Sequence, residues 1–229
     1  MYFYVDESGH TGNNLFDQSQ TSLYYSVLSS KVNLDILVLP HLKQIRKKLN
    51  VERLHAVDLS MKKLISVVPE IIKIHKRYGL TFDFYRVVKS DYALISFFDQ
   101  VFDQGNNKAV SWHAYWTPMR YVMLLKLSTL FDEVTLKKSW EARIEPDSIK
   151  AQALLIDTCK AIQGRVHLLA DARSQELVND ALQFVIDHPN EIHYNVTSKD
   201  QLLQVSPNLM GFQFVMSGIA ERLLRRKLE

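Results

Sequence analysis

Two carboxylates stand at the end of an apolar stretch that opens the chain. Residues 1–5 are all large and apolar or aromatic, and Asp6, Glu7, Ser8 and Gly9 follow them directly. A buried strand that ends in acids could hold a divalent metal ion at the edge of a sheet, where ligands collect in open α/β proteins. The alternative is that Asp6, Ser8 and Gly9 only form the turn after the strand, as these residue types often do.

A second aspartate, Asp171, ends a second apolar stretch, which begins at Val166. If both stretches are neighbouring strands, their two carboxylates meet at one edge of the sheet. Such carboxylates repel each other unless a cation lies between them, and Mg²⁺ or Mn²⁺ would resolve that conflict because these ions prefer oxygen ligands. A centre of this kind suits phosphodiester hydrolysis. The alternative is that Asp171 caps the helix that follows it, together with Ser174.

The elements that would position these acids predict an α/β fold in one domain over residues 1–229. The periodicity indicates a mixed sheet of about five strands, with the first strand central because both of its faces are apolar. These strands are expected at residues 1–5, 22–30, 81–88, 166–171 and 192–196. Helices flank the sheet, and a helical insertion with almost no strand character is expected at 90–164.

The composition is that of a globular protein. The hydrophobic fraction is 47%, the charged fraction is 23%, and the net charge of +3 permits a nucleic-acid partner without requiring one. The single cysteine, Cys159, excludes an internal disulfide and fits a reducing compartment. We expect a cytoplasmic protein with no membrane segment, because no leader precedes the first strand and no apolar stretch approaches the length of a membrane span.

The segment Tyr4-Val-Asp-Glu-Ser-Gly9 resembles the opening signature of the family called "domain of unknown function 3800". Leu54-His-Ala56 with Asp58, the acid at Asp171, and Thr197-Ser-Lys199 followed by Gly211-Phe-Gln213 resemble later motifs of that family. The resemblance implies a ribonuclease-H-like fold, an acidic metal centre and a nuclease. The site residues to which it points are Asp6, Glu7, His55, Asp171 and Gln213.

The chain departs from the family pattern on its closing helix. Met216 stands where the family has an aspartate, three residues after Gln213. Glu221 could supply a displaced third carboxylate, because Gln213, Ser217 and Glu221 share one helical face at i, i+4 and i+8. A site that lacks one acid would bind metal weakly, and the protein would then keep the fold without cleaving nucleic acid.

The sequence therefore predicts a nuclease or phosphodiesterase that depends on Mg²⁺ or Mn²⁺. Asp6 and Asp171 would be metal ligands, Glu7 or Glu221 an auxiliary acid, and His55 a proton carrier. Side chains predicted to touch nucleic acid are His10, Thr11, Gln213 and Arg222.

Two other functions stay open. The first is a catalytically weakened protein that binds nucleic acid or a protein partner. In the second, the acidic turn is structural and the apolar middle helices form a homo-oligomer interface. Single residues also have structural explanations. A loop histidine such as His55 is often a surface or capping residue. The C-terminus of a helix favours cations such as Arg222 without any ligand.

Overall fold

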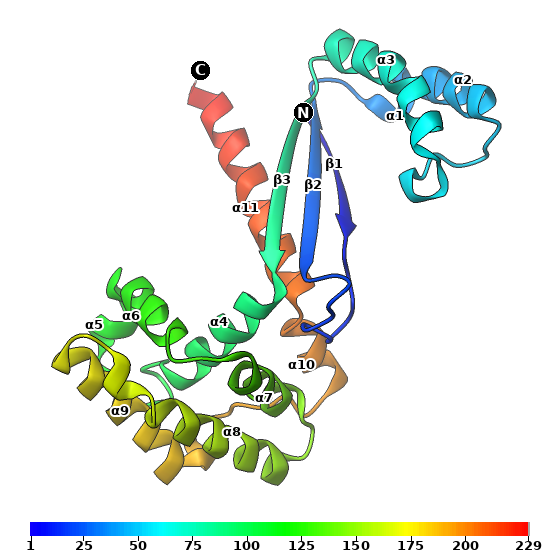
Figure 1. Ribbon diagram of the computed structural model, residues 1–229. Helices are drawn as coiled ribbons and strands as arrows, with labels where there is room; N and C mark the ends of the chain where they lie inside the picture. Colours follow the sequence, from blue (N-terminus) through cyan, green and yellow to red (C-terminus); the bar gives the residue numbers. More distant parts are fainter. Residues whose placement is uncertain (229) are drawn as a thin grey trace. The chain divides into compact units, whose positions relative to one another are not determined.

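The structure, a computed structural model, describes residues 1–228, with side chains described through Arg225 (Figure 1). The chain divides into two compact units. The first contains Met1–Ser8, Tyr24–Tyr85 and the C-terminal segment from Phe212, and the second contains Gly9–Leu23 and Arg86–Gly211. No helix in the described chain is both long and apolar enough to cross a membrane.

A three-stranded antiparallel sheet belongs to the first unit. Its strands are β1 (Tyr2–Ser8), β2 (Ser22–Ser30) and β3 (Thr81–Val88), in the order β1-β2-β3. The register of the first pair places Tyr2 opposite Ser30 and Ser8 opposite Tyr24. The predicted second and third strands are confirmed at the expected residues.

Helix α11 (Pro207–Leu228) packs against one face of this sheet through its C-terminal part. The guanidinium of Arg222 donates to the Ser29 hydroxyl and to the Asp83 carboxylate. Gly218 lies so close to Tyr85 that a Cβ there would come within 1.9 Å of the tyrosine hydroxyl. Because side chains alternate along a strand, Asp83 and Tyr85 face the helix while Phe82 and Phe84 point to the other side.

A helical hairpin joins β2 to β3 in the first unit. It comprises α1 (Leu34–Leu37), α2 (Leu39–Leu49), the short 3₁₀ helix η1 (Ala56–Asp58) and α3 (Met61–Tyr78). Ser60 caps α3 by accepting a hydrogen bond from the Lys63 amide, and the left-handed Gly79 ends it. A small core holds the hairpin together, made of Ile45, Leu49, Leu59 and Val67.

The second unit is built from helices. They are α4 (Lys89–Val101), α5 (Trp112–Trp116), α6 (Met119–Ser128), α7 (Glu133–Ile144), α8 (Ser148–Gln163), η2 (Val166–Leu168), α9 (Ala172–Asp187), η3 (Pro189–Glu191) and α10 (Lys199–Gln204). Their core contains fully buried side chains such as Phe97, Leu127, Leu155 and Leu182. This helical unit covers 86–211 with 9–23, whereas the sequence predicted a helical insertion over 90–164.

The predicted five-stranded, ribonuclease-H-like mixed sheet is wrong. Residues 166–168 form the 3₁₀ helix η2, Asp171 is the N-cap of α9, and no strand forms at 192–196. Apolar and polar residues alternate over 192–196 because Ile192, Tyr194 and Val196 are buried. These side chains are buried among helices, and the segment forms no ladder of hydrogen bonds with a strand. A period of two in burial therefore does not require a strand. The predicted central position of the first strand is also wrong, because β1 lies at the edge of the sheet.

Candidate nucleic-acid interface

The two acids of the opening motif lie on β1 and are exposed to solvent. Asp6 is opposite Ser26, and Glu7 is opposite Tyr25. Burial and the neighbouring Glu7 carboxylate together raise the pKa of Tyr25 to about 12. The turn that follows needs a glycine, since Gly9 has a φ of +92° and a Cβ there would lie 2.3 Å from the Ser22 carbonyl oxygen.

Asp171 is the N-cap of α9, so the capping alternative is confirmed and the strand-end position is wrong. Its carboxylate accepts from the Ser174 amide at 2.9 Å and pairs with the ammonium of Lys126. The hydrogen bond from Lys126, followed by those from Ser174, lowers the pKa of Asp171 to about 2. The carboxylate thus already has a cation, which removes the electrostatic reason for placing a metal ion beside it.

The remaining predicted metal and proton-transfer residues belong to the other unit of the chain. Asp171 belongs to the second unit, whereas Asp6, His55 and Glu221 belong to the first. His55 precedes η1 and its ring contacts the Asp58 carboxylate at 3.2 Å, and Glu221 is exposed on α11. Among the described residues, no three His, Cys, Asp or Glu side chains gather closely enough to hold a metal ion. Metal binding at Asp6 stays a prediction.

Three of the four predicted nucleic-acid contacts have protein partners. The His10 ring contacts the Asn208 side chain at 3.0 Å, and the Thr11 hydroxyl accepts from the buried Lys89 ammonium at 2.6 Å. Arg222 is held by Ser29 and Asp83, as described above. Gln213 is exposed on α11.

The face of the sheet that α11 leaves open is aromatic. Four large side chains on it are well exposed: Tyr2 (44%), Tyr24 (45%), Phe82 (48%) and Phe84 (74%). Phe82 and Phe84 lie nearly parallel, with ring centroids 6.3 Å apart and an interplanar angle of 10°. His75, near the end of α3, continues this row, since its ring lies 6.2 Å from that of Phe82 at an angle of 11°.

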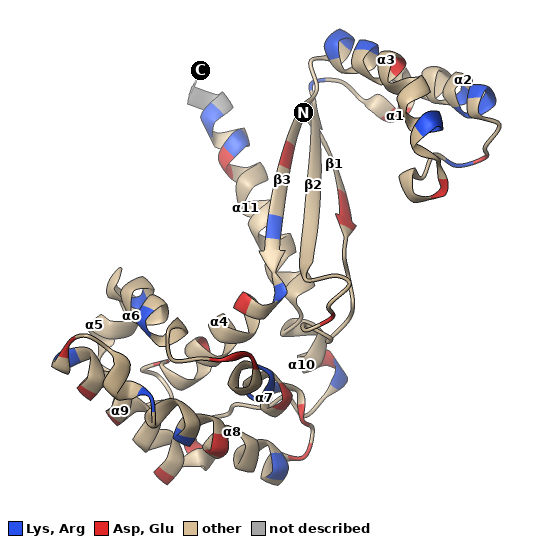
Figure 2. Cartoon of the chain, in the orientation of Figure 1, with Lys and Arg blue, Asp and Glu red and all other residues tan. Residues whose placement is uncertain are grey.

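The two long helices of the hairpin are strongly basic (Figure 2). Together α2 and α3 contain nine lysines and arginines and a single acid, Glu70, although the whole chain has a net charge of only +3. Within the described residues, one of these nine cations forms an ion pair, between Lys48 and Glu70 at 2.7 Å. The described residues therefore leave most of the positive charge of the hairpin without an ion-pair partner.

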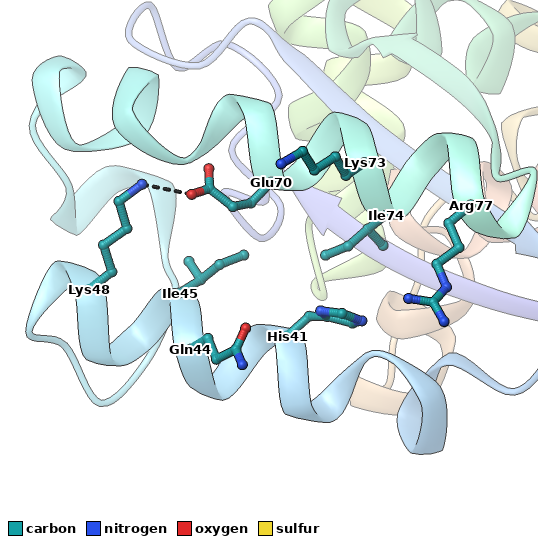
Figure 3. A pocket seen from close by; sticks show the side chains of 8 residues that line it. All are labelled: His41, Gln44, Ile45, Lys48, Glu70, Lys73, Ile74 and Arg77. Carbon is teal, nitrogen blue, oxygen red and sulfur yellow. Dashed lines mark hydrogen bonds and ion pairs between the residues drawn. The ribbon is translucent and has the colours of Figure 1, made fainter.

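A groove of about 320 Å³ runs between these helices (Figure 3). Lys48 and Glu70 lie toward one end, where the hydrogen bond from Lys48 lowers the pKa of the Glu70 carboxyl. His41 and Arg77 lie toward the other end, with Ile45 and Ile74 in the wall between. The ion pair neutralises one end of the groove and Arg77 makes the other end cationic, so the groove can accept an anionic group beside Arg77.

The sequence reasoning missed both the aromatic face and the basic hairpin. A signal for each was present: aromatic residues alternate in Phe82-Asp-Phe84, and the lysines and arginines concentrate between residues 31 and 79. The comparisons with known proteins add no family to this picture, since no protein-family model, curated protein or solved structure matches the chain.

Proposed function

We propose that this protein binds nucleic acid through helices α2 and α3. The observation that carries the proposal is the set of nine cations on these helices, eight of which form no ion pair with a described residue. Lysines and arginines that neutralise phosphates release condensed counterions, and this release supplies most of the sequence-independent affinity for nucleic acid. The proposal concerns binding, and cleavage stays a prediction that depends on Asp6.

The helix dipole explains only part of this charge. Cations in the last turn are favoured without any ligand, and His75, Lys76 and Arg77 occupy that position in α3. Lys62 and Lys63 lie in the first turn of α3, where cations are disfavoured and where the helix has no acid. Because the dipole opposes these two lysines, an anionic partner is the better explanation for their position.

Fluorescence anisotropy of a labelled oligonucleotide, titrated at several salt concentrations, tests the proposal. Neutralising the pair in a Lys62→Gln/Lys63→Gln variant should reduce the slope of log K against log salt by about 1.4 for a single strand, since each phosphate contact contributes roughly 0.7. The matched control is Lys108→Gln/Lys137→Gln. It removes the same charge from the second unit, where Glu191 and Glu133 pair with these lysines at 2.6 Å.

The control should bind as the wild type does. If both double variants weaken binding equally, the effect is one of net charge, and the assignment to α2 and α3 fails. If the wild type shows no salt-dependent binding of DNA or RNA, the proposed function itself is refuted.

A further inference from the structure

We infer that the open face of the sheet binds the bases of single-stranded nucleic acid, with Phe82, Phe84 and Tyr24 as stacking platforms. This inference rests on the proposed function and specifies its ligand as single-stranded nucleic acid. It assigns the phosphates to the basic hairpin and the bases to the sheet.

The exposure of these rings is the first argument. Isolated apolar side chains on a surface are ordinary, but a contiguous patch of them marks a binding surface. Here Phe84 is 74% exposed, and Phe82 and Tyr24 are each close to half exposed, on one face of a small sheet. On the other face, the β2 residues Tyr25, Val27 and Ser29 are buried. Tyr24, on the open face of the same strand, is exposed next to the buried Tyr25.

The arrangement of the rings is the second argument. His75, Phe82 and Phe84 form a row of nearly parallel rings. Parallel pairs also occur in the core of the second unit, where Phe98 and Phe102 lie at 8° but are buried, so the row is distinguished by its exposure together with its geometry. Parallel exposed rings offer their π-faces to planar groups, and base–aromatic stacking is the usual means by which proteins hold unpaired bases.

Charge complementarity selects nucleic acid over an apolar protein partner. The row begins at His75 in α3, directly before Lys76 and Arg77, so the rings continue from the basic hairpin in the same unit. A strand whose phosphates contact these cations has its bases within reach of the sheet. Asp6 lies on the same open face but on β1, where it repels phosphates, and this places the strand over β2 and β3.

The substrate must be single-stranded, because the faces of duplex bases are covered by their neighbours in the stack. A duplex presents only base edges and backbone to a protein surface, whereas flexible single strands can splay their bases onto aromatic rings. The basic hairpin alone would bind both forms.

Anisotropy titrations with a single-stranded and a double-stranded oligonucleotide of the same sequence test this inference. Phe84→Leu keeps an apolar side chain but removes the ring, and it should weaken single-strand binding by about 5- to 150-fold, the range for loss of one stacked base. Phe84→Trp should restore it, and its fluorescence should be quenched on binding. The control, Tyr121→Leu, removes a 66% exposed ring from the second unit and should bind normally.

The outcomes separate the inference from the proposed function. If Lys62→Gln/Lys63→Gln weakens binding but Phe84→Leu does not, the basic hairpin binds nucleic acid and the stacking face is refuted. Equal losses for single and double strands in Phe84→Leu also refute it. Sedimentation that shows a dimer dissociated by Phe84→Leu, with unchanged nucleic-acid affinity, identifies the face as a contact between copies and overturns the inference. Failure of the wild type to bind any oligonucleotide refutes both.

Discussion

Arg222 provides a direct test of which basic residues are available to a ligand. The sequence places it in a cationic segment at the end of the chain and predicts contact with nucleic acid. In the structure its guanidinium donates to Ser29 and Asp83, both at 2.8 Å, and so connects α11 to the sheet. We therefore expect Arg222→Gln to lower stability and to leave the affinity of the folded protein for nucleic acid unchanged.

The size of the stability loss follows from the two contacts. The side chains of Arg222 and Asp83 are 28% and 35% exposed, and a partly exposed ion pair of this kind contributes about 0.2–1 kcal/mol. The bond to the buried Ser29 hydroxyl contributes about 0.5–1.5 kcal/mol. Their sum predicts a loss of about 0.7–2.5 kcal/mol in the free energy of unfolding, which is a sizeable part of the roughly 5–15 kcal/mol typical of a protein.

Urea denaturation of Arg222→Gln, Asp83→Asn and the double variant measures this loss and the coupling between the two residues. A coupling energy of at least about 0.5 kcal/mol is expected for residues in direct contact. Arg222→Lys keeps the charge but not the two-pronged geometry, so it should recover only part of the stability. Unchanged stability together with weaker oligonucleotide binding in Arg222→Gln would refute the structural role of Arg222 between α11 and the sheet. It would support the contact between Arg222 and nucleic acid that the sequence predicted.

Three further predictions follow from single residues. The pKa of Asp171 is lowered to about 2, so its contribution to stability is present above about pH 4 and is lost as the pH falls toward 2. Denaturation between pH 2 and 5 should show that the free energy of unfolding depends less on pH in Asp171→Asn than in the wild type. An equal pH dependence in both proteins would contradict this prediction. Burial raises the pKa of Tyr92 to about 12, and its hydroxyl donates to the Val205 carbonyl at 2.7 Å. Stability should therefore fall as the pH rises from 10 to 12, and it should fall less steeply in Tyr92→Phe, where the raised pKa of Tyr25 still contributes. Tyr92→Phe should itself cost about 1 kcal/mol at neutral pH. Asp6→Asn should raise oligonucleotide affinity about two-fold at low salt, because the repulsion between a carboxylate and a phosphate at about 8 Å in water contributes roughly 0.5 kcal/mol. If calorimetry shows that the wild type binds Mn²⁺ and that this variant does not, the result would instead support the prediction that Asp6 is a metal ligand.

Local signals predicted much of the first unit correctly. The strands at 22–30 and 81–88 combine β-branched and aromatic residues with bounding turn residues, and both are observed at those positions. Ser60 and Gly79 mark the ends of α3 by hydrogen bonding and by left-handed backbone geometry, which depend only on neighbouring residues. Features determined within a few residues of the chain are therefore readable from the sequence.

The number and order of strands depend on partners far away in the chain. The apolar first strand lies at the edge of the sheet, although its composition predicted a central position. Residues 166–171 are apolar because Val166 and Leu169 pack in the helical core, and that environment gives the same pattern as a buried strand. Short apolar runs cannot distinguish these cases without knowledge of what covers them.

Whether an acid binds a metal ion depends on electrostatic partners that lie far away in the sequence. An aspartate after an apolar run is compatible with a metal ligand and with a helix cap, and the choice depends on the nearest cation. For Asp171 that cation is Lys126, which is 45 residues away in the sequence and reaches the carboxylate from α6. By contrast, the excess of charge on α2 and α3 requires no knowledge of contacts, because nine cations cannot be neutralised by the single acid on the same helices. The charge of a segment can therefore be read directly from the sequence, whereas the environment of two acids cannot.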